Sequence, residues 1–302
     1  MLEDQIRARL MSDANITDCL ALFDNEPAIF YQRAAPDTSS GWGDEQYPRI
    51  DYTIDTRADP SRNAAGTLYI NVWCTLFESP VEPGEIEGAI RTSLHRSIVQ
   101  DADIPACVIT WEQSNNFEGK TEGERGKDIC GYTLRFRISS MPGLATTDPC
   151  PILGLNQFTK GVFPDTAVIG LDTIDGWLDD DKTAVYWEVK QMQIRQRTNV
   201  CCWYNVTAVC TIYCKDDADK THMAAVLEEH LGCEDHVTLA DTSPLFVRDT
   251  KVLPASTGTG TGQVMFDGWY GVLLYHHNVS YHPEKVPNPD PINHMGADTG
   301  GF

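Results

Sequence analysis

The chain has 302 residues, of which 44 are acidic and 23 are basic, so its formal net charge is −21. Affinity for duplex DNA depends on Lys and Arg side chains that neutralise phosphates, so this charge argues against wrapping of DNA and against binding to an anionic membrane surface. It is compatible with a channel through which DNA passes without adhering. No segment approaches the roughly 18 consecutive apolar residues of a membrane span, and the N-terminus lacks the pattern of a signal peptide, so we expect synthesis in the cytosol.

The first half of the chain predicts a series of strands and helices. Residues 2–24 have apolar side chains at helical spacing with a break near 13–15, and residues 34–46, rich in Pro, Ser, Gly and Asp, predict a loop. The elements expected next, in chain order, are strands over 47–54 and 67–77, a helix over 85–97, a strand over 106–111, a charged loop over 114–128 and a strand over 131–138.

The second half repeats this order of elements. An offset of 136 residues places the strand 69–77 on 205–213 and the helix 85–97 on 221–233, and an offset of 137 places 131–136 on 268–273. Such nearly constant offsets predict an internal duplication, although the identity between the halves is low. The N-terminal helix has only a weak counterpart, over residues 171–178.

These patterns predict an α+β fold of two related domains. Each domain should contain a mixed or antiparallel sheet flanked by helices, with long hairpin loops. The boundaries that we expect are a first domain over 1–140, a linker over 141–164 that is rich in Pro and Gly, a second domain over 165–281, and an extended tail over 282–302.

One pattern in the second half matches a catalytic signature. Pro164-Asp165 followed by Glu188-Val189-Lys190 is typical of Mg²⁺-dependent nucleases, in which carboxylates on adjacent strands hold the metal and the lysine polarises the attacking water. Glu188 and Lys190 would share one face of a strand. The same pair is also the simple solvated ion pair of an exposed strand, and the acidic surface suits a DNA substrate poorly. A nuclease is therefore the alternative function.

The remaining motifs have simpler structural interpretations. His276, His277 and His282 cluster near the end of the last strand without visible further ligands, and the alternating Thr and Gly of 257–262 precede a strand, whereas a phosphate-binding loop precedes a helix. The ten cysteines lie mostly in apolar runs, where we expect buried free thiols. We expect no catalytic residue, no metal site and no cofactor.

The order of the elements in the first half resembles a known family. A helix leads to a loop and to the strand that begins Tyr47-Pro48-Arg49-Ile50, and a long aromatic-rich strand, Leu68 to Phe77, then precedes a helix and two further strands. This resembles the tail terminator, or tail completion, proteins of long-tailed bacteriophages, over about residues 2–140 and more weakly over 183–275. The resemblance implies a small α/β fold that forms a ring at the head-proximal end of the tail tube. It carries no catalytic residues.

The resemblance also implies partners and a location. The expected protein is a structural virion protein of the tail or neck, assembled in the host bacterial cytoplasm. Its partners would be further copies of itself in the ring, the tail tube protein, and the head–tail connector or a neck protein, with DNA passing through the lumen without specific binding. Because family members usually have one such domain, the duplication leaves two arrangements: a trimer whose six domains mimic a sixfold ring, or a hexamer with two stacked tiers. A tail tube component or another oligomeric structural module is a further alternative.

Long polar loops would contact the neighbouring subunits of such a ring, since loops reach outward from the sheets that carry them. The contact residues that we expect are Glu118, Lys120, Glu122, Arg125 and Lys127 in the first loop, and Thr257, Gly260 and Gln263 in the corresponding loop of the second half.

Overall fold

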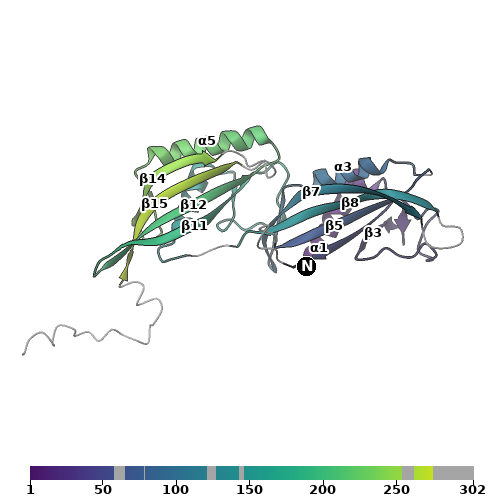
Figure 1. Ribbon diagram of the computed structural model, residues 1–302, viewed down its shortest axis with the longest axis horizontal. Helices are drawn as coiled ribbons and strands as arrows, with labels where there is room; N and C mark the ends of the chain where they lie inside the picture. The colour runs from purple at the N-terminus through teal and green to yellow at the C-terminus, as the bar shows by residue number, and fades with distance from the viewer. Residues whose placement is uncertain (58–64, 78, 121–126, 143–145, 254–261, 275–302) are drawn as a thin grey trace, which may run out of the picture. The chain divides into compact units, whose positions relative to one another are not determined.

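A computed structural model describes residues 1–57, 65–77, 79–120, 127–142, 146–253 and 262–274 (Figure 1). The fold is mixed α+β, as the sequence predicts, with two curled mixed sheets flanked by helices. The chain divides into two compact units, which we describe separately. Unit 1 comprises residues 1–143, 172–184 and 213–216, and unit 2 comprises the rest. No helix in the described part of the chain is long and apolar enough to cross a membrane.

Unit 1 contains a seven-stranded sheet in the order β10-β6-β7-β8-β5-β4-β3, in which β3 and β4 are parallel and the other pairs are antiparallel. The elements are α1 (Leu2–Ser12), α2 (Ala14–Thr17), the short β1 (Leu22–Phe23) and β2 (Glu26–Pro27), β3 (Ile29–Tyr31), β4 (Arg49–Asp55), β5 (Gly66–Thr75), α3 (Pro83–Leu94), β6 (Ser97–Asp101), β7 (Ile104–Lys120), β8 (Asp128–Ser140) and β10 (Gly176–Trp177).

Alternation along the strands gives the sheet of unit 1 two different faces. In β5 the buried side chains of Leu68, Ile70 and Val72 belong to the same core cluster as Ile6 of α1 and Ile90 of α3. Successive strand residues point to opposite faces, so the intervening residues of β5 lie on the side away from these helices. We call this side the outer face; it carries Asp51, Tyr69, Asn71, Trp73, Thr133 and Arg135.

Unit 2 contains a six-stranded sheet in the order β13-β14-β15-β12-β11-β9. Helices α4 and α5 contribute Leu155 and Leu227 to its core, where they join Val206 and Phe266 from the sheet. The elements are α4 (Pro151–Val162), β9 (Ala167–Val168), β11 (Ala184–Arg197), β12 (Cys201–Tyr213), α5 (Asp217–Cys233), β13 (His236–Thr238), β14 (Pro244–Leu253) and β15 (Gln263–Leu273).

The two sheets repeat one topology. The order β6-β7-β8-β5-β4-β3 in unit 1 corresponds, strand for strand, to β13-β14-β15-β12-β11-β9 in unit 2, and α3 and α5 occupy the same place in the chain order. The counterpart of α1 is α4, which precedes the second sheet as α1 precedes the first. The weak helical counterpart expected over 171–178 is wrong, because this segment contains strand β10.

The registers correct the offset of the last strand. Leu134 and Phe136 are buried in the core, but an offset of 137 would place them on Gly271 and Leu273, of which Leu273 is exposed. An odd change in offset moves every side chain of a strand to the other face of the sheet. An offset of 136 places Asn71 of β5 on Thr207 of β12. Asn71 is opposite Thr133 of β8, and Thr207 is opposite Asp267 of β15, so β8 corresponds to β15 at an offset of 134. Both pairs are joined by a side-chain hydrogen bond.

Two segments expected to be irregular are partly regular. The linker predicted over 141–164 contains helix α4, whose Ile152 and Leu155 are buried in the core of unit 2. The loop predicted over 114–128 is mostly strand, because β7 continues to Lys120 and β8 begins at Asp128. The first stretch of unit 1 ends at 143, close to the boundary expected at 140, but 172–184 and 213–216, expected in the second domain, also belong to unit 1. The predicted tail over 282–302 lies outside the described residues.

Candidate functional site

Three of the predicted contact residues lie at the closed end of the β7–β8 hairpin. The Lys120 Nζ lies 3.2 Å from Asp128 Oδ1, and Glu118 is exposed two residues earlier on β7. Lys127 donates from Nζ to Gln46 Oε1 at 3.0 Å and lies 5.9 Å from the centre of the Tyr47 ring. The hairpin end is therefore joined to the loop that precedes β4. Glu122 and Arg125 lie outside the described residues.

The predicted contact residues of the second half are separated from this hairpin in the fold. Gln263 is the first residue of β15 in unit 2, where its Nε2 donates to Thr211 Oγ1 at 3.3 Å. This contact places Gln263 in the sheet and not in the preceding loop. Thr257 and Gly260 lie outside the described residues.

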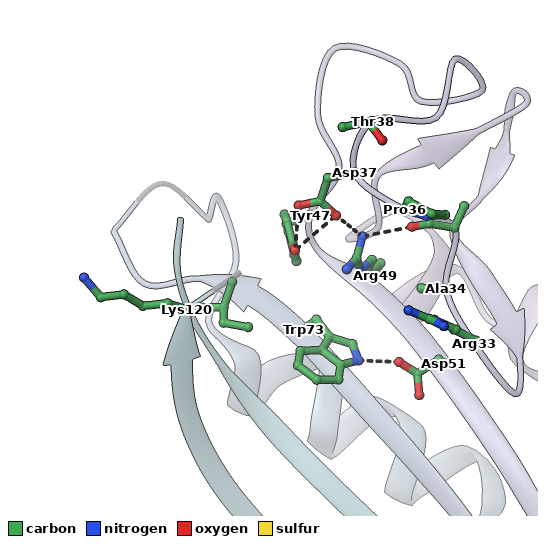
Figure 2. Close-up of a pocket in the computed structure, with 12 residues that line it drawn as sticks. Arg33, Ala34, Pro36, Asp37, Thr38, Tyr47, Arg49, Asp51, Trp73 and Lys120 are labelled. Carbon is green, nitrogen blue, oxygen red and sulfur yellow. Dashed lines mark hydrogen bonds and ion pairs between the residues drawn. The ribbon is translucent and has the colours of Figure 1, made fainter. Parts of the chain in front are cut away.

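A pocket of about 470 Å³ opens beside the hairpin end (Figure 2). Its floor is Asp51 and Trp73 on the outer face of the sheet. One wall is the loop 33–38, together with Tyr47 and Arg49, and the opposite side is formed by Lys120 and Ile129. The pocket thus lies between a loop, two central strands and the hairpin end that carries the predicted contact residues.

Arg49 holds the loop wall in place. Its Nη1 donates to Asp37 Oδ1 at 2.6 Å and to the Ala35 carbonyl oxygen at 3.4 Å, and its guanidinium carbon lies 4.5 Å from the centre of the Tyr47 ring. The Tyr47 hydroxyl donates to Asp37 Oδ2 at 3.1 Å. Burial raises the pKa of Tyr47 to about 12, so at neutral pH its hydroxyl keeps the proton that it donates. Hydrogen bonds with a charged partner are stronger than neutral ones, so this triad fixes the loop on the sheet.

The pocket floor is a hydrogen-bonded row across three strands. Asp51 is 8% exposed and accepts hydrogen bonds from Trp73 Nε1 and, at 2.8 Å, from Asn71 Nδ2. Asn71 Oδ1 in turn accepts from Thr133 Oγ1 at 2.8 Å. The Trp73 ring packs against Phe117 of β7, with 4.7 Å between the ring centres. The indole is therefore held from both sides, so the floor is rigidly placed.

Ionisation of Asp51 should make the protein less stable as the pH rises. Burial raises the pKa of the Asp51 carboxyl, although the hydrogen bonds from Asn71 and Trp73 act to lower it. The folded state then holds this proton more tightly than the unfolded state, so the stability that it contributes is lost as the pH rises through the folded pKa. Asp51→Asn retains an acceptor oxygen and cannot ionise. The free energy of unfolding of Asp51→Asn, measured with urea, should therefore increase relative to that of the wild type as the pH rises from about 4 to about 7.

Asp55 on the same strand provides the control for this experiment. Hydrogen bonds from Arg57 lower the pKa of Asp55, so the stability linked to its ionisation is present at neutral pH and lost in acid. The free energy of unfolding of Asp55→Asn should therefore decrease relative to that of the wild type over the same pH range. The decrease should be small, because this carboxyl is solvent-exposed. If the free energies of unfolding of the wild type and Asp51→Asn changed equally with pH, the raised pKa of Asp51 would be contradicted.

The chemistry of the pocket suits recognition of a partner's side chain. Arg33 brings a cationic group to its lining, and the Trp73 indole offers an aromatic surface. Lys120 also lines the pocket, but its Nζ is paired with Asp128 and points away from the Trp73 ring (Figure 2). A carboxylate can bind a guanidinium such as that of Arg33 through charge-assisted hydrogen bonds. Within the pocket, Asp37 and Asp51 already accept hydrogen bonds from Arg49 and Trp73. A carboxylate is the group that this lining fits.

Two residues of the predicted nuclease signature, Glu188 and Lys190, form an ion pair with each other. Lys190 Nζ contacts Glu188 Oε1 on strand β11, which is the simple interpretation of this pair, and Asp165 lies in the turn after α4. Among the residues that the structure describes, no group of three or more His, Cys, Asp or Glu side chains is arranged to hold a metal ion. His276, His277 and His282 lie outside these residues.

Sequence reasoning missed the principal pocket residues, Asp37, Arg49, Asp51 and Trp73. One signal was present: in the strand predicted over 47–54, charged Arg49 and Asp51 alternate with apolar Ile50 and Tyr52, which indicates a polar face on a central strand. No family model matches the chain, and no curated protein is significantly similar to it. The function is therefore inferred from the architecture and from this pocket.

Proposed function

We propose that the chain is a structural protein of a phage tail or neck that forms a ring at the head-proximal end of the tail tube and joins the tube to the head connector. The observation that carries this proposal is the repetition of one sheet topology within a single chain. Two related but different sheets provide each subunit with two different contact surfaces. A ring closes through such heterologous contacts, in which one surface binds another on the next subunit.

The pocket beside the hairpin end could provide one of the two surfaces of this contact between subunits. Its cationic lining residue Arg33 can bind an acidic segment, and each neighbouring copy has a net charge of −21. Opposite charges across an interface promote association and fix its register. The ring would be a trimer of duplicated subunits or a hexamer with two tiers.

The acidity also agrees with passage of DNA. In a ring whose lumen is lined by carboxylates, the phosphates are repelled and the duplex slides without adhering. The tail tube protein below and the connector or neck protein above are the partners in this proposal. A tail tube component, built from the same kind of sheet, would have the same acidic lumen.

Native mass spectrometry and negative-stain imaging of the purified full chain test the proposal. We expect closed rings of three or six chains, and we expect Arg33→Glu/Lys120→Glu to weaken assembly by about tenfold or more, since like charges would then face each other. The matched control is Arg57→Glu/Lys182→Glu, which makes the same change in charge at two exposed residues of unit 1.

Two results would contradict the proposal. One is a chain that remains monomeric both alone and with tail tubes. The other is Mg²⁺-dependent DNA cleavage that Glu188→Ala abolishes, which would favour the nuclease. Equal loss of assembly in both charge variants would show that total charge matters and that the pocket does not.

A further inference from the structure

Strand β11 has a long edge without a neighbouring strand in the described part of the chain. In the sheet order of unit 2, β11 lies between β12 and β9. Strand β11 has 14 residues and β9 has two, and the Ile169 N–H next to β9 donates to the Val185 carbonyl oxygen near the start of β11. The stretch 188–197 thus lies along the border of the sheet, as Figure 1 shows for β11.

An open strand edge presents backbone N–H and C=O groups that can pair with another strand. Proteins often protect such edges with charged side chains, so the basic residues Lys190, Arg195 and Arg197 could serve only this purpose. The apolar residues at the same end of the sheet argue against protection alone. Ile194 of β11 is 58% exposed, and Val200 in the turn to β12 is 69% exposed.

A third apolar residue extends this exposed group. Leu273 at the end of β15 is opposite Cys201 in the register and is 46% exposed, and the next N–H, that of Leu274, donates to the Val200 carbonyl oxygen at 3.0 Å. Val200 is therefore opposite Leu274, one residue beyond Leu273, at the same end of the sheet. An open edge that ends in exposed apolar side chains favours burial by a partner.

The charge of this edge indicates what the partner is. Residues 188–197 include three basic side chains and one acidic side chain, in a chain with a net charge of −21. A second copy of the chain has a net charge of the opposite sign, and contact through this edge reduces the repulsion between copies. Pairing through a sheet edge requires a second open edge on that copy.

Unit 1 supplies such an edge on β7. Strand β6 pairs with β7 only as far as Ser97↔Ile109, while β8 pairs with the other side of β7 as far as Lys120↔Asp128. In the described residues, the stretch 112–120 of β7 is therefore the border of its sheet. This stretch contains two acidic residues, Glu112 and Glu118, and one basic residue, Lys120. Glu112 is paired with Arg135 and Lys120 with Asp128, whereas Glu118 is exposed.

We propose that the open edge of β11, residues 188–197, pairs with the open edge of β7, residues 112–120, of a second copy of this chain. This inference rests on the proposed ring and names the strands that join its subunits. The basic edge of unit 2 in one copy meets the edge of unit 1 that carries the exposed Glu118 in the next, which is a heterologous contact. Ile194 is then buried, and Arg195 and Arg197 face Glu118.

Hydrogen exchange measured on the assembled and the monomeric full chain tests the pairing. Amides of 188–197 and 112–120 should exchange at least about tenfold more slowly in the assembly, because strand pairing protects edge amides. Arg195→Glu/Arg197→Glu should weaken assembly by about tenfold or more, and adding Glu118→Arg to it should restore part of the loss. The control Arg248→Glu/Lys251→Glu makes the same charge change on β14 of the same sheet.

Each outcome separates this inference from the proposed function. A ring in which 188–197 exchanges as fast as in the monomer overturns the strand pairing and leaves the ring intact. Protection of 188–197 without rescue by Glu118→Arg overturns β7 as the paired strand. A wild-type chain that never assembles overturns both the ring and the pairing. Equal weakening by the β14 control would assign the effect to total charge and overturn the pairing.

Discussion

Replacing Gly131 by alanine is expected to reduce the free energy of unfolding by about 3 kcal/mol, the upper end of the usual cost of overpacking, because the added Cβ meets the backbone. Gly131 lies in β8 between Trp73 of β5 and Phe117 of β7. A Cβ at this position would overlap the Val72 carbonyl oxygen and lie 2.7 Å from Phe117 Cζ. The centre of the sheet and the Trp73–Phe117 contact must then shift, and the pocket floor with them.

Gly119→Ala in the same hairpin is the matched control. A Cβ there meets only the Ile129 side chain, at 3.8 Å, which is an ordinary contact. We expect this variant to change the unfolding free energy by no more than about 0.5 kcal/mol, and in the stabilising direction, because alanine restricts the unfolded chain. Urea denaturation followed by tryptophan fluorescence measures both. Equal stability of the two variants would contradict the close approach at Gly131.

The fold class could be predicted because its signals are local. Alternation in the strand 67–77 follows directly from burial of Leu68, Ile70 and Val72 on one face of β5, and the apolar stripe of the helix 85–97 corresponds to Ile86, Ile90 and Leu94 of α3. The duplication was visible from the order of these elements. The exact offset was not, because it depends on the register between strands distant in sequence.

The pocket could not be predicted because distant segments assemble it. Arg49 and Asp51 come from β4, Trp73 from β5 and Lys120 from the hairpin end, and only the register of the sheet brings them together. The composition of 141–164 also led to a wrong prediction, because its proline and glycine residues indicated a linker. Proline is well tolerated in the first turn of a helix, where Pro151 lies, so it does not prevent α4. What stabilises α4 is burial against a sheet later in the sequence.

The stability of Leu155→Ala tests whether α4 belongs to the core of unit 2 or to a solvated linker. The Leu155 side chain is fully buried, in the same cluster as Val185 and Trp187 of β11. A second contact joins α4 to this strand, since Trp187 Nε1 donates to Thr159 Oγ1 at 2.9 Å. Removing a buried leucine to alanine costs about 2–5 kcal/mol through lost transfer energy and the remaining cavity. We expect urea unfolding to move to lower concentration by a corresponding amount.

Hydrogen exchange then shows which elements depend on α4. Amides of β11 and β12 should exchange faster in Leu155→Ala, because their core cluster is weakened. Gly161→Ala in the last turn of the same helix is the control: no atom lies within 4 Å of the added Cβ, and alanine favours the helix by about 0.5 kcal/mol or more. A substitution in a solvated linker would change stability by no more than about 0.5 kcal/mol. If Leu155→Ala were as mild as that, α4 would not be packed against the sheet, and the correspondence between α4 and α1 in the duplicated topology would lose its physical basis.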